Sequence, residues 1–474
     1  MDKKVAIIAV VVIAIIIAAA AALALTSNKS NERSYNLDDI KDAPQNASIN
    51  GKAECYDKFE VSGCNLLIFG NVNNDMDINS DDVFILKNII NTGVWDKTKY
   101  PLADVNCDKK VNNDDLVALN KIINKEKTLL YYVNDNGYPE YIHYPITGNL
   151  GINYDYGYMA AQIIGIWDRV TAGIDRWVGD RVTDTLYPGV HELYNMGTEQ
   201  TVEADLAAYQ AAGVTVITGS RNLDVNNALH EAGWGIDYIN VRLDQCKYIA
   251  NVEPIDRFLT FSFMFDKLEK GKEFYNYWTG LDNKIQTIFD NAGIEEKTFI
   301  IPYNTNQAVE TSVDDALATG RTMGDYTNVA SNLPLTAKLE PSTVATSPCY
   351  TTTIEYLFTQ NPDVLIISLW GKLTNETSYS DAYAAFKEKA DYYSKFDAYK
   401  NGDVYGVCYE TFGTFAGVAV LYLLCSYIYP EYFSEADGWN YVNEYFHNYT
   451  LIDKNKDIKE CGGLIVFKLG KTSP

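Results

Sequence analysis

Two stretches of the chain, 71–82 and 104–115, repeat one pattern of oxygen-bearing side chains. Calcium loops of twelve residues need side-chain oxygens at positions 1, 3, 5, 9 and 12 and a carbonyl at position 7, because Ca²⁺ takes six to eight hard ligands. The predicted ligands are Asn71, Asn73, Asp75, Asn79, Asp82 and the Asp77 carbonyl in loop 1, and Asp104, Asn106, Asp108, Asn112, Asp115 and the Lys110 carbonyl in loop 2. The duplication predicts two calcium ions as cofactors. Such loops bind weakly unless calcium is plentiful, so we expect this region outside the cell.

The same helical pattern follows each loop, with apolar residues three and four apart. The repeated stripe is Val83, Leu86, Ile89 and Ile90 in one copy and Leu116, Leu119, Ile122 and Ile123 in the other. Two such loop-helix pairs can close on each other to hide both stripes, with Ile78 and Val111 at position 8 buried beneath the ions. The region resembles a type I dockerin, a small all-α calcium module, over about 65–127. We call it the calcium-loop unit; the resemblance implies a cohesin domain as a partner.

Two departures from the dockerin pattern concern the ions. Position 6, normally Gly for a left-handed turn, is Met76 in loop 1 and Lys109 in loop 2. Loop 1 also opens with neutral Asn71, so Asp75 and Asp82 are its only ligand carboxylates. We therefore expect loop 1 to bind calcium more weakly than loop 2. A calcium-stabilised spacer that docks onto nothing stays open as an alternative.

The N-terminus carries an uninterrupted apolar run, 5–25, preceded by Lys3 and Lys4. At 1.5 Å per residue the run is about 31 Å long as a helix, enough to cross a bilayer. The positive-inside rule then places the body of the protein outside. The sequence predicts a transmembrane anchor over 1–25, with a cleaved signal peptide as the alternative, and a polar linker over 26–64. Both interpretations predict an exported protein at the cell surface.

Charge and length limit the remaining possibilities. The chain has 474 residues and a formal net charge of −24, and 47% of its residues are hydrophobic. This acidity argues against nucleic acid as a partner, because its phosphates would be repelled. The length predicts two or three folded units rather than one.

From about residue 128 short β-branched runs alternate with helical patterns, which predicts parallel α/β sheets. The clearest runs are 214–217, 298–301 and 364–367. Between the first two, apolar residues spaced at three and four predict one long amphipathic helix over 271–291: Phe274, Trp278, Leu281, Ile285, Ile288 and Phe289. We expect an N-terminal lobe over 128–270 and a C-terminal lobe over 292–474, joined by this helix with a ligand cleft between them.

Several segments of this α/β region resemble ABC transporter solute-binding proteins of the helix-hinged class. Residues 354–367 are similar to a helix, Asn-Pro-Asp turn and strand of that class, 398–405 to a strand segment, and 421–433 to its last helix. The resemblance is looser in the N-terminal lobe, at 187–188, 196–197 and 201–206. It implies a two-lobed periplasmic-binding-protein-like module that captures a ferric siderophore, haem or cobalamin for an ABC permease.

The same resemblance implies one acidic residue per lobe that pairs with arginines of the permease. Charge-assisted pairs of this kind give orientation as well as affinity. By motif match these residues are Glu355 in the C-terminal lobe and Glu203 in the N-terminal lobe, with Asp205 as the substitute for Glu203. Alternatively, Glu355 and Glu203 are first-turn carboxylates favoured by the helix dipole.

Candidate ligand contacts come from loops that follow strands: Arg221, Trp370, Tyr409 and Glu410. Aromatic and Arg side chains there can stack on a macrocycle or pair with an anionic chelate, and lobe packing is the alternative role. No Gly-x-Ser-x-Gly elbow occurs, and His191-Glu192 does not complete a zinc-protease motif. We therefore interpret the chain as a receptor without catalytic residues. A surface adhesion or assembly protein and an exported polysaccharide-active enzyme remain as alternatives.

Overall fold

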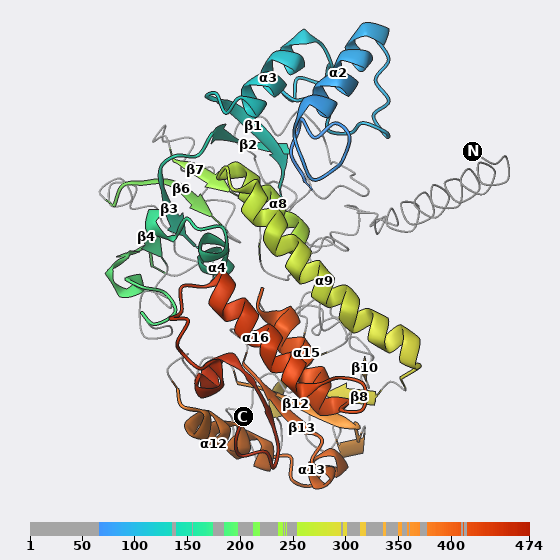
Figure 1. Cartoon of the computed structure of the whole chain (residues 1–474), viewed down its shortest axis with the longest axis vertical. Helices are drawn as coiled ribbons and strands as arrows, with labels where there is room; N and C mark the ends of the chain where they lie inside the picture. The colour runs from blue at the N-terminus through green and yellow to red at the C-terminus, as the bar shows by residue number, and fades with distance from the viewer. Residues whose placement is uncertain are drawn as a thin grey trace, which may run out of the picture.

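The structure is a computed structural model, and Figure 1 shows its elements in order along one elongated molecule. It describes residues 66–134, 139–153, 155–173, 184–197, 212–218, 236–239, 241, 243, 254–294, 297–300, 313–318, 335–337, 349–352, 358–359, 361–369, 377–408, 411 and 415–474. The predicted anchor over 1–25 and the linker over 26–64 lie outside these residues. Within the described ranges no helix is both long and apolar enough to cross a membrane.

The calcium-loop unit contains two helices, α2 (Ser80–Thr92) and α3 (Asn113–Ile123). Each begins with a reciprocal capping box, in which an Asn and the Asp three residues later satisfy each other's backbone N–H groups. The predicted stripe is present twice with the same burial: its two middle residues are buried and its two outer residues are half-buried. The two helices contact each other, which confirms the expected closure of the repeat.

A short hairpin connects this unit to the lobes. Strands β1 (Thr128–Val133) and β2 (Pro139–Tyr144) pair antiparallel. The chain at the start of the calcium-loop unit lies along β1, since Phe69 N donates to Tyr131 O at 3.0 Å and Val133 N donates to Leu67 O at 3.0 Å. The pairing of this segment with β1 therefore crosses the boundary expected at 127–128 and ties the calcium-loop unit to the hairpin.

The N-terminal lobe has a five-stranded sheet in the order β5-β4-β3-β6-β7. All neighbouring pairs are parallel, as predicted for this region. The strands are β3 (Asn149–Ile152), β4 (Val170–Gly173), β5 (Tyr194–Asn195), β6 (Val214–Thr218) and β7 (Asp237–Ile239), and helix α4 (Asp155–Ile163) follows β3. Two 3₁₀ turns, η2 (Trp167–Arg169) and η3 (Val190–Glu192), complete its described elements.

The long interlobe helix exists and is slightly longer than predicted. Helix α8 (Pro254–Met264) leads through an elbow at 265–267 into α9 (Leu268–Ala292). The 25 residues of α9 span about 37 Å. Five of the six predicted apolar positions are buried, and Ile288 is half-buried. Figure 1 shows α9 running from the calcium-loop unit and N-terminal lobe to the side of the C-terminal lobe that holds β8 and β10.

The C-terminal lobe is built on a sheet in the order β10-β8-β12-β13-β14, parallel except for β14. Its strands are β8 (Lys297–Ile300), β10 (Leu335–Ala337), β12 (Val364–Ser368), β13 (Val404–Val407) and β14 (Val466–Lys468), and β9 (Val313–Ala318) pairs with β11 (Cys349–Thr352) apart from it. Its helical elements are α12 (Tyr379–Asp391), α13 (Asp397–Asn401), α15 (Gly417–Ile428), α16 (Glu435–Tyr449), η5 (Ile458–Glu460) and η6 (Gly462–Leu464). Every residue of α15 is buried.

One prediction for this lobe is wrong. The sequence predicts 421–433 as the last helix, but α15 starts earlier at Gly417, ends at Ile428, and is followed by α16. The apolar run that forms α15 begins before residue 421, and Pro430 lies just past its end, where proline cannot continue a helix. Helix α16 then packs on α15.

An aromatic cluster ties the helices together where the lobes meet. Phe258 of α8 lies 5.3 Å from Phe274 of α9 and 5.0 Å from Phe415, which precedes α15. Phe274 also contacts Tyr449 of α16, with ring centroids 4.9 Å apart. Edge-to-face aromatic pairs of this kind add stabilisation beyond their buried area. The long helix is therefore fixed to both lobes by close packing.

Candidate functional site

Loop 2 of the calcium-loop unit holds two carboxylates away from solvent. Asp104 and Asp115, at positions 1 and 12, are both fully buried. Asp115 accepts hydrogen bonds from Asn106 N at 3.2 Å and Asn112 N at 2.8 Å, and Asp104 accepts from Lys109 N at 2.8 Å. Burial, together with the smaller effect of the nearby negative charges of Asp104 and Asp108, raises the pKa of Asp115 to about 6. A bound cation would relieve this concentration of desolvated negative charge.

The backbone of loop 2 adopts the turn that calcium loops require. Lys109 at position 6 has φ 71°, the left-handed conformation usually left to Gly. Position 4 is left-handed in both loops, at Asn74 (φ 60°) and Cys107 (φ 54°), whereas Met76 at position 6 of loop 1 is not left-handed. Lys109 in place of Gly thus keeps the left-handed turn at position 6 of loop 2, whereas Met76 in place of Gly removes it from loop 1.

In loop 1, backbone and side-chain N–H groups donate hydrogen bonds to acceptors within the same loop. Asp82 at position 12 is buried, which raises its pKa, and it accepts hydrogen bonds from Val72 N at 2.7 Å and Asn79 N at 2.8 Å. At positions 1 and 3, however, the side-chain amide of Asn71 donates to Asp75 O at 2.7 Å and that of Asn73 donates to Asp75 Oδ2 at 2.6 Å. A cation bound in loop 1 would have to displace these two hydrogen bonds.

The residues of loop 2 therefore fit a calcium ion better than those of loop 1. The ligands would be oxygen atoms of Asp, Asn and the backbone, and among the described residues no group of three or more His, Cys, Asp or Glu side chains gathers as a metal site. The apolar position 8 differs between the loops, since Ile78 is buried and Val111 is only half-buried. The expectation that both are buried is thus wrong for Val111.

The predicted ligand and docking residues cannot be placed by geometry. Arg221, Trp370, Tyr409 and Glu410, and likewise Glu203, Asp205 and Glu355, lie outside the described residues. The strands that precede the four ligand candidates are described: β6, β12 and β13 are parallel members of the two sheets. The carboxyl ends of such strands form the edge at which open α/β sheets bind ligands. The assignment of these residues stays a prediction.

Two polar residues at this edge were missed by sequence reasoning. Asn153 directly follows β3, Thr218 ends the adjacent β6, and Asn153 N donates to Thr218 O at 3.1 Å. Both residues are almost completely buried, at 0% and 1% exposure. Neither the side-chain amide of Asn153 nor the hydroxyl of Thr218 has a hydrogen-bond partner in the described part of the chain. Such buried groups are rare and point to a binding or catalytic role.

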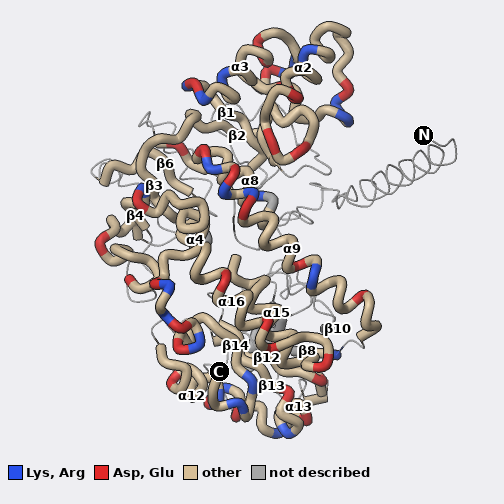
Figure 2. Tube along the Cα trace, viewed as in Figure 1, with Lys and Arg blue, Asp and Glu red and all other residues tan. Residues whose placement is uncertain are grey.

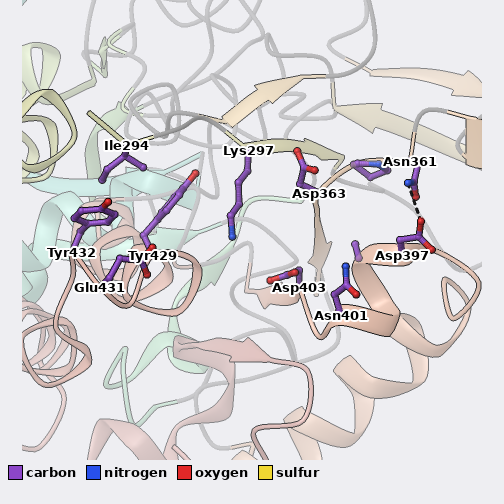
Figure 3. Close-up of a pocket in the computed structure, with 12 residues that line it drawn as sticks. Ile294, Lys297, Asn361, Asp363, Asp397, Asn401, Asp403, Tyr429, Glu431 and Tyr432 are labelled. Carbon is purple, nitrogen blue, oxygen red and sulfur yellow. Dashed lines mark hydrogen bonds between the residues drawn. The ribbon is translucent and has the colours of Figure 1, made fainter. Parts of the chain in front are cut away.

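A cavity of about 720 Å³ lies at the opposite edge of the C-terminal sheet (Figure 3). Lys297 begins β8, and Asp363 and Asp403 directly precede β12 and β13, so the cavity lies at the amino ends of these strands. Its acidic groups are already paired in part: Asp363 accepts from Thr298 N at 2.7 Å, and Asp397 pairs with Lys400 at 2.8 Å. This cavity is therefore separate from the expected interlobe site.

Acidic residues occur throughout the protein. Figure 2 shows Asp and Glu spread over the calcium-loop unit and both lobes rather than gathered on one element, in keeping with the formal net charge of −24. A spread of negative charge of this kind keeps like molecules apart.

The chain was compared with known proteins. No protein-family model matches it, and no curated protein matches its sequence. The solved structure of the TroA-like periplasmic binding protein FepB from Veillonella parvula is similar to it, with TM-score 0.54 and 14% identity over 72% of this chain and 99% of that chain. A periplasmic solute binding protein from Veillonella parvula DSM 2008 gives TM-score 0.51 and 12% identity over 70% and 97% of the two chains.

The protein therefore has the two-lobed α/β fold of periplasmic solute-binding proteins, as predicted for the region after residue 128. At these identities the likeness concerns the fold. Both of these relatives are named as binding proteins. The interpretation of this chain as a receptor without catalytic residues stays a prediction.

Proposed function

We propose that the protein is an extracytoplasmic solute receptor that captures an iron chelate (a siderophore or haem) or cobalamin and delivers it to an ABC importer. The observation that supports this most is the arrangement of a parallel sheet and a mostly parallel sheet joined by α9, with the aromatic cluster of Phe258, Phe274 and Phe415 at the junction. A stiff connection lets two lobes hold a bulky ligand with little rearrangement, which lowers the cost of binding. The apolar run 5–25 would anchor the receptor in the membrane.

The buried side chains of Asn153 and Thr218 would form one wall of the proposed ligand site. Asn153 would hydrogen-bond a polar group of the ligand, because it lies at the binding edge of the sheet and its amide has no described partner. We expect Asn153→Ala to weaken binding of whichever of haem, cobalamin or a ferric siderophore the protein captures by about tenfold. Asn149→Ala, at the other end of the same strand, is the matched control and should bind as the wild type does. Equal affinities for both variants would contradict the placement.

Docking to the permease separates a transport receptor from an adhesion protein. We expect Glu355→Arg to abolish uptake in cells while ligand affinity is unchanged, because reversal turns an attractive contact with a permease arginine into repulsion. Glu388→Arg changes the same charge at an exposed position of α12 and should leave uptake intact. Uptake that survives Glu355→Arg would favour the alternative of a surface adhesion protein.

We also propose that loop 2, and more weakly loop 1, binds calcium. When bound, the ion would neutralise the charge gathered on Asp104, Asp108 and Asp115. We expect Asp115→Asn to weaken calcium binding by about tenfold or more, since affinity follows the number of charged ligands. Asp114→Asn alters an exposed neighbour and should have little effect. Isothermal titration calorimetry of the full protein measures the calcium affinity of the two variants. Equal affinities would contradict the assignment of Asp115 as a ligand.

A cohesin domain remains the proposed protein partner of this unit. Phe84 on α2 and Val117 on α3 occupy the same place in the two repeats and are 67% and 56% exposed. Large apolar side chains at matched exposed positions suit a partner that contacts both helices. Binding of a purified cohesin domain should be lost in the Phe84→Ser, Val117→Ser double variant and kept in Val94→Ser, which changes an exposed valine outside the repeat. If the wild-type protein does not bind cohesin, the unit is a spacer.

A further inference from the structure

The calcium-loop unit contacts the interlobe helix directly through its first loop. Lys272, in the second turn of α9, donates to the carboxylate of Asp77, which occupies position 7 of loop 1. The same ammonium group contacts Glu269 at 3.1 Å, and the side chain of Lys272 is only 19% exposed. Position 7 of a calcium loop offers its backbone carbonyl to the ion, so the Asp77 side chain is left for the contact with Lys272.

A second contact joins the other half of the repeat to the elbow between α8 and α9. Lys125, just past the end of α3, pairs with Asp266 at 2.6 Å. Both residues have a left-handed backbone with φ 56°. For residues other than Gly this conformation costs free energy and persists when the surroundings hold it in place. The end of α3 and the elbow are therefore joined by an ion pair whose side chains are 56% and 47% exposed, so its contribution by itself is small.

The apolar core is continuous across the same boundary. Ile78, at position 8 of loop 1, and Ile122 of α3 line a cavity of about 360 Å³ together with Tyr144 and Phe263. The rings of Tyr144 and Phe263 are stacked, with centroids 5.7 Å apart. The residue expected beneath the loop 1 ion thus lies at the junction with the receptor. In Figure 1 the calcium-loop unit is placed beside the start of α9, in agreement with these contacts.

We propose that the calcium-loop unit is a built-in brace of the receptor, and that calcium binding in its loops stabilises α8 and α9, the helices that join the lobes. The inference rests on the calcium binding proposed above. An ion bound between positions 1 and 12 of loop 1, in place of the amide contacts that Asn71 and Asn73 make with Asp75, would fix the loop around Asp77 and Ile78. Asp77 contacts Lys272, and Ile78 lines the cavity at the elbow. If the unit were joined to the receptor only by a flexible linker, calcium binding to it would not affect α9.

Hydrogen exchange of the full chain in detergent, followed by mass spectrometry with calcium, with magnesium and with chelator, tests the brace. We expect calcium to slow exchange in peptides from 254–292 by about tenfold, because a ligand of the folded state suppresses the openings that disrupt its site. In Lys272→Met the slowing should fall to about threefold or less, in line with the loss of one partly exposed ion pair. Lys270→Met is the matched control: Lys270 pairs with Glu273 on the same helix and should behave as the wild type does.

Calcium stoichiometry, measured by titration on the same samples, separates the possible failures. If calcium binds and slows exchange within 66–127 alone, the brace is overturned and the calcium sites stand. If Lys272→Met and Lys270→Met respond alike, the proposed path through Lys272 is overturned. If no calcium binds, the calcium assignment fails and the brace fails with it, whereas ligand capture by the lobes is unaffected.

Discussion

Replacement of Thr260 by valine tests how firmly the calcium-loop unit is attached. Leu67 N donates to Thr260 Oγ1 at 3.0 Å across 193 residues of sequence, and the two residues are 7% and 1% exposed. Valine has nearly the same shape as threonine but no hydroxyl, so the variant leaves a buried N–H without its acceptor. An unsatisfied buried donor costs about 1 to 3 kcal/mol. We expect Thr260→Val to lower the free energy of unfolding by that amount.

Urea unfolding of the full chain, followed by circular dichroism, measures the change. Thr279→Val is the matched control, because the Thr279 hydroxyl donates at 2.7 Å to the Tyr275 carbonyl one turn earlier in α9, and its removal leaves no backbone donor unpaired. We expect its effect to stay within about 0.5 kcal/mol. If the two variants lose the same stability, or if Thr260→Val matches the wild type, the contact with Leu67 does not hold the unit in place.

Three glycine replacements give further predictions by the same urea assay. Gly280→Ala should raise the free energy of unfolding by about 0.5 to 1 kcal/mol, because Gly280 lies within α9 and an added Cβ meets nothing within 4 Å. A lower free energy of unfolding would contradict the exposure of this position of α9. Gly406→Ala should lower it by about 1 to 3 kcal/mol, since its Cβ would lie 2.6 Å from a ring carbon of Phe386 in the C-terminal lobe; a neutral result would contradict that packing. Gly438→Ala should also destabilise, because its Cβ would lie 2.9 Å from the backbone of Leu423 where α16 crosses α15; unchanged stability would mean that these helices are further apart.

The most reliable predictions of helices and strands came from the local periodicity of apolar residues. The stripe of α9 repeats over many turns, so its apolar face and its ends were predicted to within three residues. The repeated loop-helix pattern was recognisable because the spacing of its oxygen-bearing side chains and the helix that follows repeat together; calcium binding by these loops stays a prediction. Strands β6, β8 and β12 were predicted to within one residue for a related reason: each is a short β-branched run that lies in the middle of a buried parallel sheet.

Contacts between distant parts of the chain left no such signal. The pairing of Phe69 with Tyr131, and of Leu67 with Thr260, joins segments that look like loop and helix when read alone. The attachment of the calcium-loop unit is therefore visible in the structure and not in the sequence. Asn153 was missed because one asparagine after a strand is indistinguishable from an ordinary turn residue until its burial is known.

Equilibrium titration of the full protein with haem, cobalamin and a ferric siderophore, followed by recovery and mass analysis of the ligand, tests the receptor assignment most directly. The account predicts saturable binding of one of these compounds at one site per chain, with the compound recovered chemically unchanged. Chemical conversion of a bound compound, or no binding of any of the three, would contradict it.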